Sequence, residues 1–179
     1  MDRQGRDDVV IIMTTSEPRA VFSATFARGL TSPSQNRAQQ ITERLSWNSL
    51  SPSVLNLNTI SVTNMRNMFT SASAFNQPLS FNTISVTNMS FMFQGATAFN
   101  QNIGAWNVAK VTNFVNFMVG KTPATFSTTN LDAIYNGWIN VLSSKTITFG
   151  TAKYSAAGVA GRAYLTGTKL WTITDGGQV

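Results

Sequence analysis

The sequence contains no cysteine and no histidine, and it has few charged residues. Without cysteine, disulfides and thiolate metal sites are excluded, and without histidine the commonest general base is missing as well. Charged residues make up 11% of the 179 residues, less than half of the usual quarter. Apolar residues make up 42%, which is enough for a core, so the polarity of this chain comes mainly from Asn, Thr, Ser and Gln.

The scarcity of acidic residues argues against catalysis. Beyond residue 17 only Glu43, Asp132 and Asp175 are acidic, and they fall in separate predicted elements, so we expect no carboxylate pair for glycoside hydrolysis. No histidine is present to activate a serine nucleophile. The GKT sequence at 120–122 lacks the earlier glycine of a phosphate loop, because Val115 stands there, and is interpreted as a turn. We expect no enzymatic activity, no cofactor and no bound metal.

Long apolar runs are also missing. The run Val9–Met13 has five residues, too short for a secretory signal, and nothing approaches the ~20 apolar residues of a membrane span. We therefore expect a chain that is made in the cytoplasm, without a signal peptide or a membrane span. The basic residues do not cluster: residues 51–120 hold only Arg66 and Lys110. This thin distribution disfavours nucleic acid as a partner.

What the sequence does contain is an internal repeat. Residues 58–69 read NTISVTNMRNMF, residues 82–93 read NTISVTNMSFMF, and a weaker copy, NVAKVTNFVNFM, occupies 107–118. A second shared phrase lies between the copies, SAFNQPLSFN at 73–82 and TAFNQNIGAWN at 97–107. A fixed period of 24–25 residues is typical of stacked coils, in which each unit buries its apolar face against its neighbours.

Each coil is predicted to contain a short strand, a turn and a helix of one or two turns. Met65, Met68, Phe69 and Ala72 have the spacing of one helical face. Thr63 and Thr87 precede this face in the first two copies, where a hydroxyl is expected to cap the helix. Stacking would align the strands into a parallel sheet. The predicted repeat core is Met65, Met68, Phe69, Phe75, Leu79, Met89, Met92, Phe93, Phe99, Ile103 and Phe117.

Asparagine and threonine recur in register along the repeats. The two predicted rows of asparagine are Asn58, Asn82 and Asn107, and Asn64, Asn88 and Asn113. A row of threonine contains Thr63, Thr87 and Thr112. An amide has both a donor and an acceptor, so identical amides one coil apart are predicted to form a ladder, whereas stacked like charges would repel.

The segments on either side of the repeats differ in character. At the N-terminus, two short strands are predicted over Val9–Thr15 and Arg19–Phe26, followed by a helix over residues 34–45. At the C-terminus, the pattern predicts a helix, a strand, a second helix and a second strand, over Leu131–Leu142, Lys145–Phe149, Ser155–Leu165 and Leu170–Thr174. The predicted division is an attachment region or cap at 1–45, a repeat solenoid at 46–120 and a C-terminal cap at 121–179.

The pattern VTNM-x-x-MF followed by FNQ-x-L resembles the ~25-residue repeats of the BspA-like surface proteins, a group that is also described from mycoplasma lipoproteins and includes phage-encoded members. The match is carried by Asn58–Leu79, Asn82–Ile103 and, less well, Trp106–Met118, and the segment Asn130–Gly177 looks like the module that follows such repeats. The resemblance implies an α/β fold, a leucine-rich-repeat-like solenoid used for surface display, adhesion or binding, with no catalytic residues to carry over.

The sequence favours a non-catalytic structural or protein-interaction protein. A surface-type repeat without an export signal fits a virion-associated surface, fibre or decoration component, docked onto other structural proteins through residues 1–45. The alternatives are an extracellular adhesin that binds glycans, and a nucleic-acid-associated protein. Trp106 and Trp138 are expected in the core, whereas Trp171 is left open. The candidate partner contacts are Arg3, Arg6, Arg19, Arg28 and Trp47, with Arg37 added for nucleic acid.

Overall fold

The computed structural model describes residues 9–13, 22–26 and 59–179. Strands β1 (Val9–Met13) and β2 (Phe22–Phe26) pair antiparallel, with Val9 opposite Phe26. Their β-branched and aromatic residues favour extended backbone, and the predicted pair of N-terminal strands is confirmed. The helix predicted over residues 34–45 lies outside the described residues.

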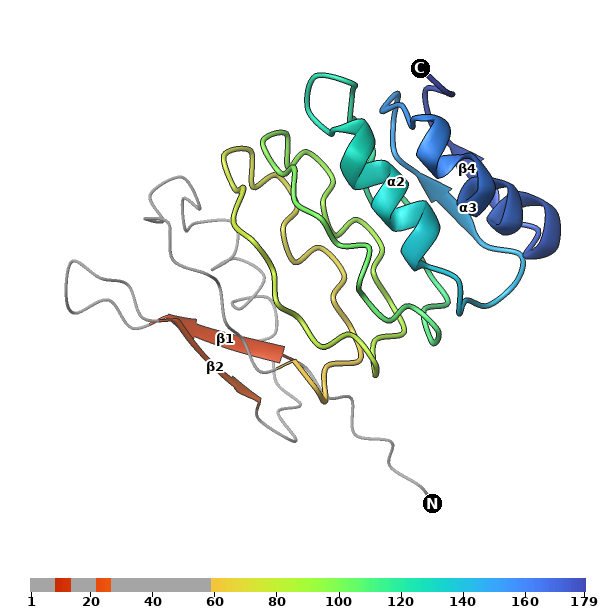
Figure 1. Ribbon diagram of the computed structural model, residues 1–179. Helices are drawn as coiled ribbons and strands as arrows, with labels where there is room; N and C mark the ends of the chain where they lie inside the picture. The colour runs from red at the N-terminus through yellow and green to blue at the C-terminus, as the bar shows by residue number, and fades with distance from the viewer. Residues whose placement is uncertain (1–8, 14–21, 27–58) are drawn as a thin grey trace.

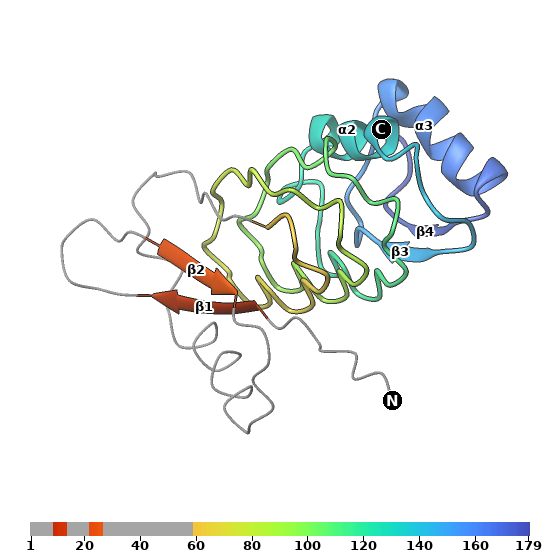
Figure 2. The same ribbon diagram turned by 90° about the horizontal axis from the view of Figure 1, so that it is seen from below.

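Residues 59–126 wind through three successive coils that lie side by side (Figures 1 and 2). We name them coil 1, coil 2 and coil 3, which are residues 59–81, 82–106 and 107–126. Parallel bridges join Asn64 to Asn88 and Asn88 to Asn113, at equivalent positions of the repeat. Within residues 59–126 these bridges stand in place of the predicted strands and parallel sheet. The contacts are of the kind a stacked solenoid makes, and the solenoid class itself stays a prediction.

The segment of each coil that was predicted as a helix is a series of consecutive turns. The N–H of Met68 donates to the carbonyl of Met65 at 3.3 Å, within coil 1. The next N–H, that of Phe69, donates instead to the carbonyl of Met92 in coil 2 at 2.9 Å. An α-helix would use both N–H groups internally, so this alternation excludes one. The helix prediction was wrong because apolar residues spaced i, i+3 and i+4 also fall on the inner side of consecutive turns.

Two positions in every coil have left-handed backbone. The first is occupied by Asn67, Phe91 and Asn116 (φ 60°, 59° and 53°), and the second by Ser71, Gly95 and Gly120 (φ 59°, 69° and 92°). Glycine adopts this conformation without strain and asparagine tolerates it better than other residues do. The recurrence of the same φ at the same repeat position gives successive coils the same shape, which is what allows them to stack.

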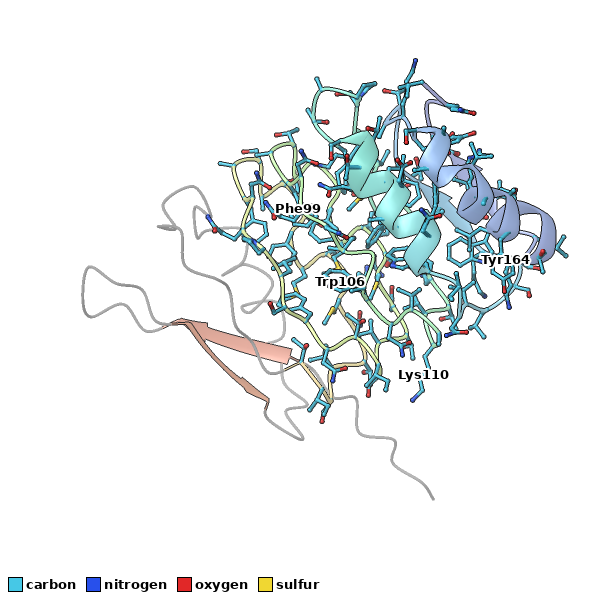
Figure 3. All side chains as sticks on the ribbon, viewed as in Figure 1. Phe99, Trp106, Lys110 and Tyr164 are labelled. Carbon is cyan, nitrogen blue, oxygen red and sulfur yellow. The ribbon has the colours of Figure 1, made fainter. Side chains whose placement is uncertain are left out.

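The interior of the coils is a stack of aromatic rings. Phe69 lies on Phe93 with ring centroids 5.4 Å apart and an interplanar angle of 4°. The pairs Phe75–Phe99 and Phe81–Trp106 repeat this arrangement at 6.0 and 5.9 Å. Of the eleven predicted core residues, ten are buried and Met68 is partly buried. Figure 3 shows Phe99 and Trp106 between the coils. The core continues without a break into the C-terminal segment.

The C-terminal segment contains two main helical regions and two short strands. They are α2 (Thr128–Gly137), β3 (Thr146–Thr148), the 3₁₀-helix η2 (Ala156–Gly158), α3 (Val159–Ala163), the π-helix η3 (Tyr164–Thr168) and β4 (Thr172–Thr174). Strands β3 and β4 pair in parallel, with Ile147 opposite Ile173. A bridge from Phe114 to Ile147 joins β3 to coil 3, so the parallel contacts run on through the cap. The predicted order of helix, strand, helix and strand is confirmed.

Helix α2 is shorter than the sequence predicts. It begins after Ser127, whose hydroxyl accepts from the N–H of Asn130, and ends at Gly137. Gly137 and Gly104 approach so closely that a Cβ on Gly137 would lie 2.1 Å from the carbonyl oxygen of Gly104. Leu142, which was placed on the buried face of this helix, follows its end and is exposed. The apolar spacing of the sequence continues past the end of the helix, where Gly137 packs tightly against Gly104.

Candidate functional site

The predicted asparagine rows do not form side-chain ladders. The Oδ1 atoms of Asn82 and Asn107 accept from the N–H groups of Ile84 and Ala109, two residues further on in the same coil. Asn64, Asn88 and Asn113 do the same for Arg66, Ser90 and Val115. Each amide therefore closes a local Asx turn, while the backbone makes the bridges between coils. Asn58 lies outside the described residues.

A ladder of amides does exist, but in the FNQ phrase. The Oδ1 atom of Asn76 accepts from the N–H of Asn100 at 2.8 Å and from the amide of Gln101 at 2.9 Å. In the next layer, the Oδ1 atom of Asn100 accepts from the N–H of Ser127 at 2.9 Å and from Nδ2 of Asn130 at 2.8 Å. This ladder ties coil 1 to coil 2 and coil 2 to the start of α2. The shared letters FNQ were the signal for it in the sequence.

The threonine row bonds between coils instead of capping helices. The hydroxyl of Thr87 donates to the carbonyl of Thr63 at 3.1 Å, and the hydroxyl of Thr112 donates to the carbonyl of Thr87 at 3.0 Å. Their backbone N–H groups donate to the same carbonyls. The predicted cap role of Thr63 and Thr87 is therefore wrong, because no helix follows them, and the row is a second line of bonds along the stack.

Lys121 is a buried structural residue that the sequence did not reveal. Its side chain is buried, with 2% of the residue exposed, although it belongs to the GKT sequence that was interpreted as a turn. Its Nζ atom donates to the carbonyl oxygens of Ala96 at 2.5 Å, Phe99 at 2.6 Å and Thr97 at 3.2 Å. Burial lowers the pKa of Lys121 to about 8. The ammonium group thus satisfies three carbonyls at the turn of coil 2, from a position one repeat further on.

The two acidic residues of the cap are both engaged. Asp132 accepts from the N–H and the hydroxyl of Ser155 at 2.9 and 2.5 Å, and so holds η2 against α2. Asp175 accepts from Nε of Arg162 at 2.7 Å and from the hydroxyl of Tyr135 at 2.6 Å. Burial alone would raise the pKa of Asp175, but the bonds from Arg162 and Tyr135 outweigh it and hold that pKa below its usual value.

Tyr135 shows the opposite effect of the same cluster. Burial raises the pKa of its phenol, and the bond it donates to Asp175 raises it further. The hydroxyl therefore remains a donor over the whole physiological range of pH. Asp132 sits in the middle of α2, and no acidic residue lies in the first turn of this helix. These carboxylates connect elements of the cap to one another.

The predicted partner contacts and the tryptophans do not form a site among the described residues. Arg3, Arg6, Arg19, Arg28, Arg37 and Trp47 lie outside the residues whose side chains the structure describes. Trp106, Trp138 and Trp171 are 6%, 1% and 4% exposed, so none of them presents an open ring to a sugar. Among residues 59–179 no group of three acidic, histidine or cysteine side chains gathers to hold a metal. In the described part of the chain no helix has the length and apolar character of a membrane span.

Comparison with known proteins gives a family but no function. The pattern of the family described as Mycoplasma protein of unknown function, DUF285, matches residues 37–137, which is 101 of the 179 residues. The chain belongs to this family, which is related to the BspA-like mycoplasma repeat proteins. Neither the curated proteins nor the solved structures contain a match.

Proposed function

We propose that the chain is a short leucine-rich-repeat-like solenoid that serves as a non-catalytic structural and interaction protein. More specifically, we propose a virion-associated surface, fibre or decoration component that docks through residues 1–45. The observation that supports a scaffold role is the use of polar side chains to bond one layer to the next. Asn76, Asn100 and Lys121 all bond the neighbouring layer, at distances of 2.5 to 3.2 Å.

Polar side chains used in this way make the stack rigid, which favours a scaffold role over a catalytic one. Each of these hydrogen bonds joins two layers, so deforming one coil strains the next. The stacked rings of Phe69 and Phe93 also join coil 1 to coil 2. A stiff body with a regular surface suits a component that positions a binding face away from an anchor. The separate character of residues 1–45, which hold most of the acidic residues, supports their assignment as the anchor.

The test is incorporation into particles. Particles from a culture that produces the full chain are purified on a density gradient and probed with an antibody to the C-terminal cap. The full chain is expected to sediment with the particles, and a variant without residues 1–45 is expected to remain in the soluble fraction while keeping its melting transition. Equal incorporation of both chains would overturn the docking role, and absence of the full chain from particles would overturn the virion assignment.

The extracellular adhesin is separated from this function by a glycan array. Because the three tryptophans of residues 59–179 are buried, stacking of a sugar on a tryptophan would depend on Trp47. Clear array hits that disappear in Trp47→Ala would favour the adhesin. Binding of DNA that weakens steeply with salt would favour the nucleic-acid alternative.

A further inference from the structure

One edge of the molecule carries an exposed apolar side chain in almost every layer. Ile60 in coil 1 is 54% exposed and Ile84 in coil 2 is 47% exposed. In the cap, Leu142 before β3 is 40% exposed and Leu170 before β4 is 63% exposed. The third coil places Ala109 at the equivalent position, beside the exposed Lys110. We name these residues, Ile60, Ile84, Ala109, Leu142 and Leu170, the apolar ridge.

The parallel contacts place Ile60, Ile84, Ala109 and Leu142 in one row. Ile60, Ile84 and Ala109 each precede by four residues an asparagine of the bridged series Asn64, Asn88 and Asn113. Ala109 and Leu142 each precede by five residues the bridged pair Phe114 and Ile147. In both views the turns that contain the first three ridge residues lie in a line along one edge (Figures 1 and 2).

The last two layers of the ridge are joined directly. The indole Nε1 of Trp171 donates to the carbonyl of Leu142 at 2.7 Å, and the N–H of Ser144 donates to the carbonyl of Lys169 at 2.8 Å. Leu142 and Leu170 therefore lie on neighbouring turns. At a layer spacing of about 4.8 Å, five layers make a row roughly 20 Å long.

Leu170 is held on this row at a conformational cost. Its φ is 57°, in the left-handed region that L-residues other than glycine disfavour. Ser144, on the adjoining turn, also has a φ of 57°. A strained leucine that is buried gains packing in return, but Leu170 is mostly exposed and gains little. Strained backbone of this kind persists where the surrounding structure holds it, and it is found often at functional sites.

The charges along the ridge have one sign. In the chain, Lys110 follows Ala109, Lys169 precedes Leu170 and Lys145 comes three residues after Leu142. Figure 3 shows Lys110 extending from this edge, and the Nζ atom of Lys169 lies 5.7 Å from the centroid of the Tyr164 ring. The acidic residues of the segment 59–179 are Asp132 and Asp175, and both are engaged within the cap, by Ser155 and by Arg162. The ridge thus combines apolar side chains with lysines and with no opposing carboxylate in that segment.

We propose that the apolar ridge docks onto an anionic lipid bilayer. A row of exposed side chains along one edge can meet a flat surface along its whole length. The apolar side chains would enter the boundary between headgroups and acyl chains, and the lysines would lie among anionic headgroups. No ridge residue belongs to residues 1–45, so particle docking and lipid docking can hold or fail independently.

The experiment is co-sedimentation of the full chain with vesicles. One set of vesicles contains phosphatidylcholine with about 30% phosphatidylglycerol, and the other set contains phosphatidylcholine alone. The ridge variant is the double substitution Ile84→Ser with Leu142→Ser. The matched control is Val115→Ser with Val159→Ser, because these two valines are similarly exposed, at 49% and 41%, and lie off the ridge. A thermal melt by circular dichroism checks that both variants fold.

Full chain bound to the anionic vesicles, with the partition coefficient lowered about tenfold in the ridge variant and unchanged in the control, would support the proposal. Binding that is equally strong in the ridge variant would mean attraction by charge alone and would overturn it. Binding lost equally in both double variants, or absent from anionic vesicles altogether, would overturn it as well.

Discussion

The Oδ1 atom of Asn100 lies 2.8 Å from Nδ2 of Asn130, and this contact joins coil 2 to the first turn of α2. The same Nδ2 atom also donates to the backbone carbonyl of Asn100 at 2.9 Å. Asn100 acts here only through its oxygens and Asn130 through its nitrogen. The two amides look alike in the sequence, but their roles in the ladder are opposite.

We predict opposite tolerance of aspartate at these two positions. Asn100→Asp keeps an acceptor oxygen toward Ser127 and Asn130, so the free energy of unfolding should fall by less than about 1 kcal/mol. Asn130→Asp replaces the donor by a carboxylate that faces two oxygens, and should cost about 2 kcal/mol. Urea unfolding at pH 7 measures both.

A third variant isolates the helix dipole. Position 130 is in the first turn of α2, where a negative charge gains about 0.3–1 kcal/mol. Thr129→Asp, at an exposed site in the same turn, should therefore be neutral or slightly stabilising. If Asn130→Asp behaved like Thr129→Asp, the ladder would not carry the contact between coil 2 and the cap.

Lys121 is predicted to be a structural cation. Lys121→Met keeps most of the buried chain but leaves the carbonyls of Ala96, Thr97 and Phe99 without this donor, so the free energy of unfolding should fall by about 2–4 kcal/mol. Lys110→Met, at an exposed site, should change it by less than about 0.5 kcal/mol. Similar losses in the two variants, measured by urea unfolding, would contradict the buried role.

The lowered pKa of Lys121 predicts a specific dependence of stability on pH. The group titrates near pH 10.5 in the unfolded chain and at about 8 in the folded one. Between these values the unfolded chain binds more protons, so the contribution of Lys121 to stability rises as the pH rises. The maximal gain is about 3 kcal/mol.

This rise is measured best between pH 7.5 and about 9.5. Above that range the raised pKa of Tyr135 acts in the other direction, because the phenol ionises in the unfolded chain first. The difference in unfolding free energy between the wild-type chain and Lys121→Met should grow with pH across the window. A flat difference would show that Lys121 keeps its ordinary pKa in the fold.

The left-handed backbone of the coils predicts different costs for two glycines. Both Gly120 and Gly167 have open space where a Cβ would be placed, but only Gly120 has a positive φ, of 92°. Gly120→Ala should therefore lower the free energy of unfolding by about 1–2 kcal/mol. Gly167→Ala lies in a helical segment and should be neutral or stabilising. Thermal denaturation of the two variants checks the difference.

The sequence predicted the register of the stack well. A repeat of 24–25 residues led to the pairing of Asn64 with Asn88, and the apolar residues of each coil were placed in the core. Burial and register follow from side-chain pattern, which a sequence displays directly. The strands and helices of the C-terminal segment were predicted for the same reason, since Leu131, Ile134 and Tyr135 are buried along α2 as their spacing indicates.

The sequence did not reveal which carbonyl groups accept hydrogen bonds from the backbone N–H groups. Consecutive turns and a short helix present apolar side chains at the same spacing, and they differ only in whether alternate N–H groups leave the coil. The left-handed φ of Phe91 has no signature in its residue type. Lys121 was misread because a lysine in a turn is usually solvated, and its three carbonyl partners lie a whole repeat earlier in the chain.

Cross-linking tests the stacking of like on like most directly. The chain has no cysteine of its own, so pairs introduced at the exposed or half-exposed threonine row can be read without background. Residues one layer apart are about 4.8 Å from each other, within the range of a disulfide, whereas residues two layers apart are about 10 Å from each other and outside it. Under mild oxidation, Thr63→Cys with Thr87→Cys and Thr87→Cys with Thr112→Cys should each form an intramolecular disulfide, measured by mass spectrometry. Thr63→Cys with Thr112→Cys should not. Failure of both neighbouring pairs, or equal yield from the distant pair, would contradict the stack.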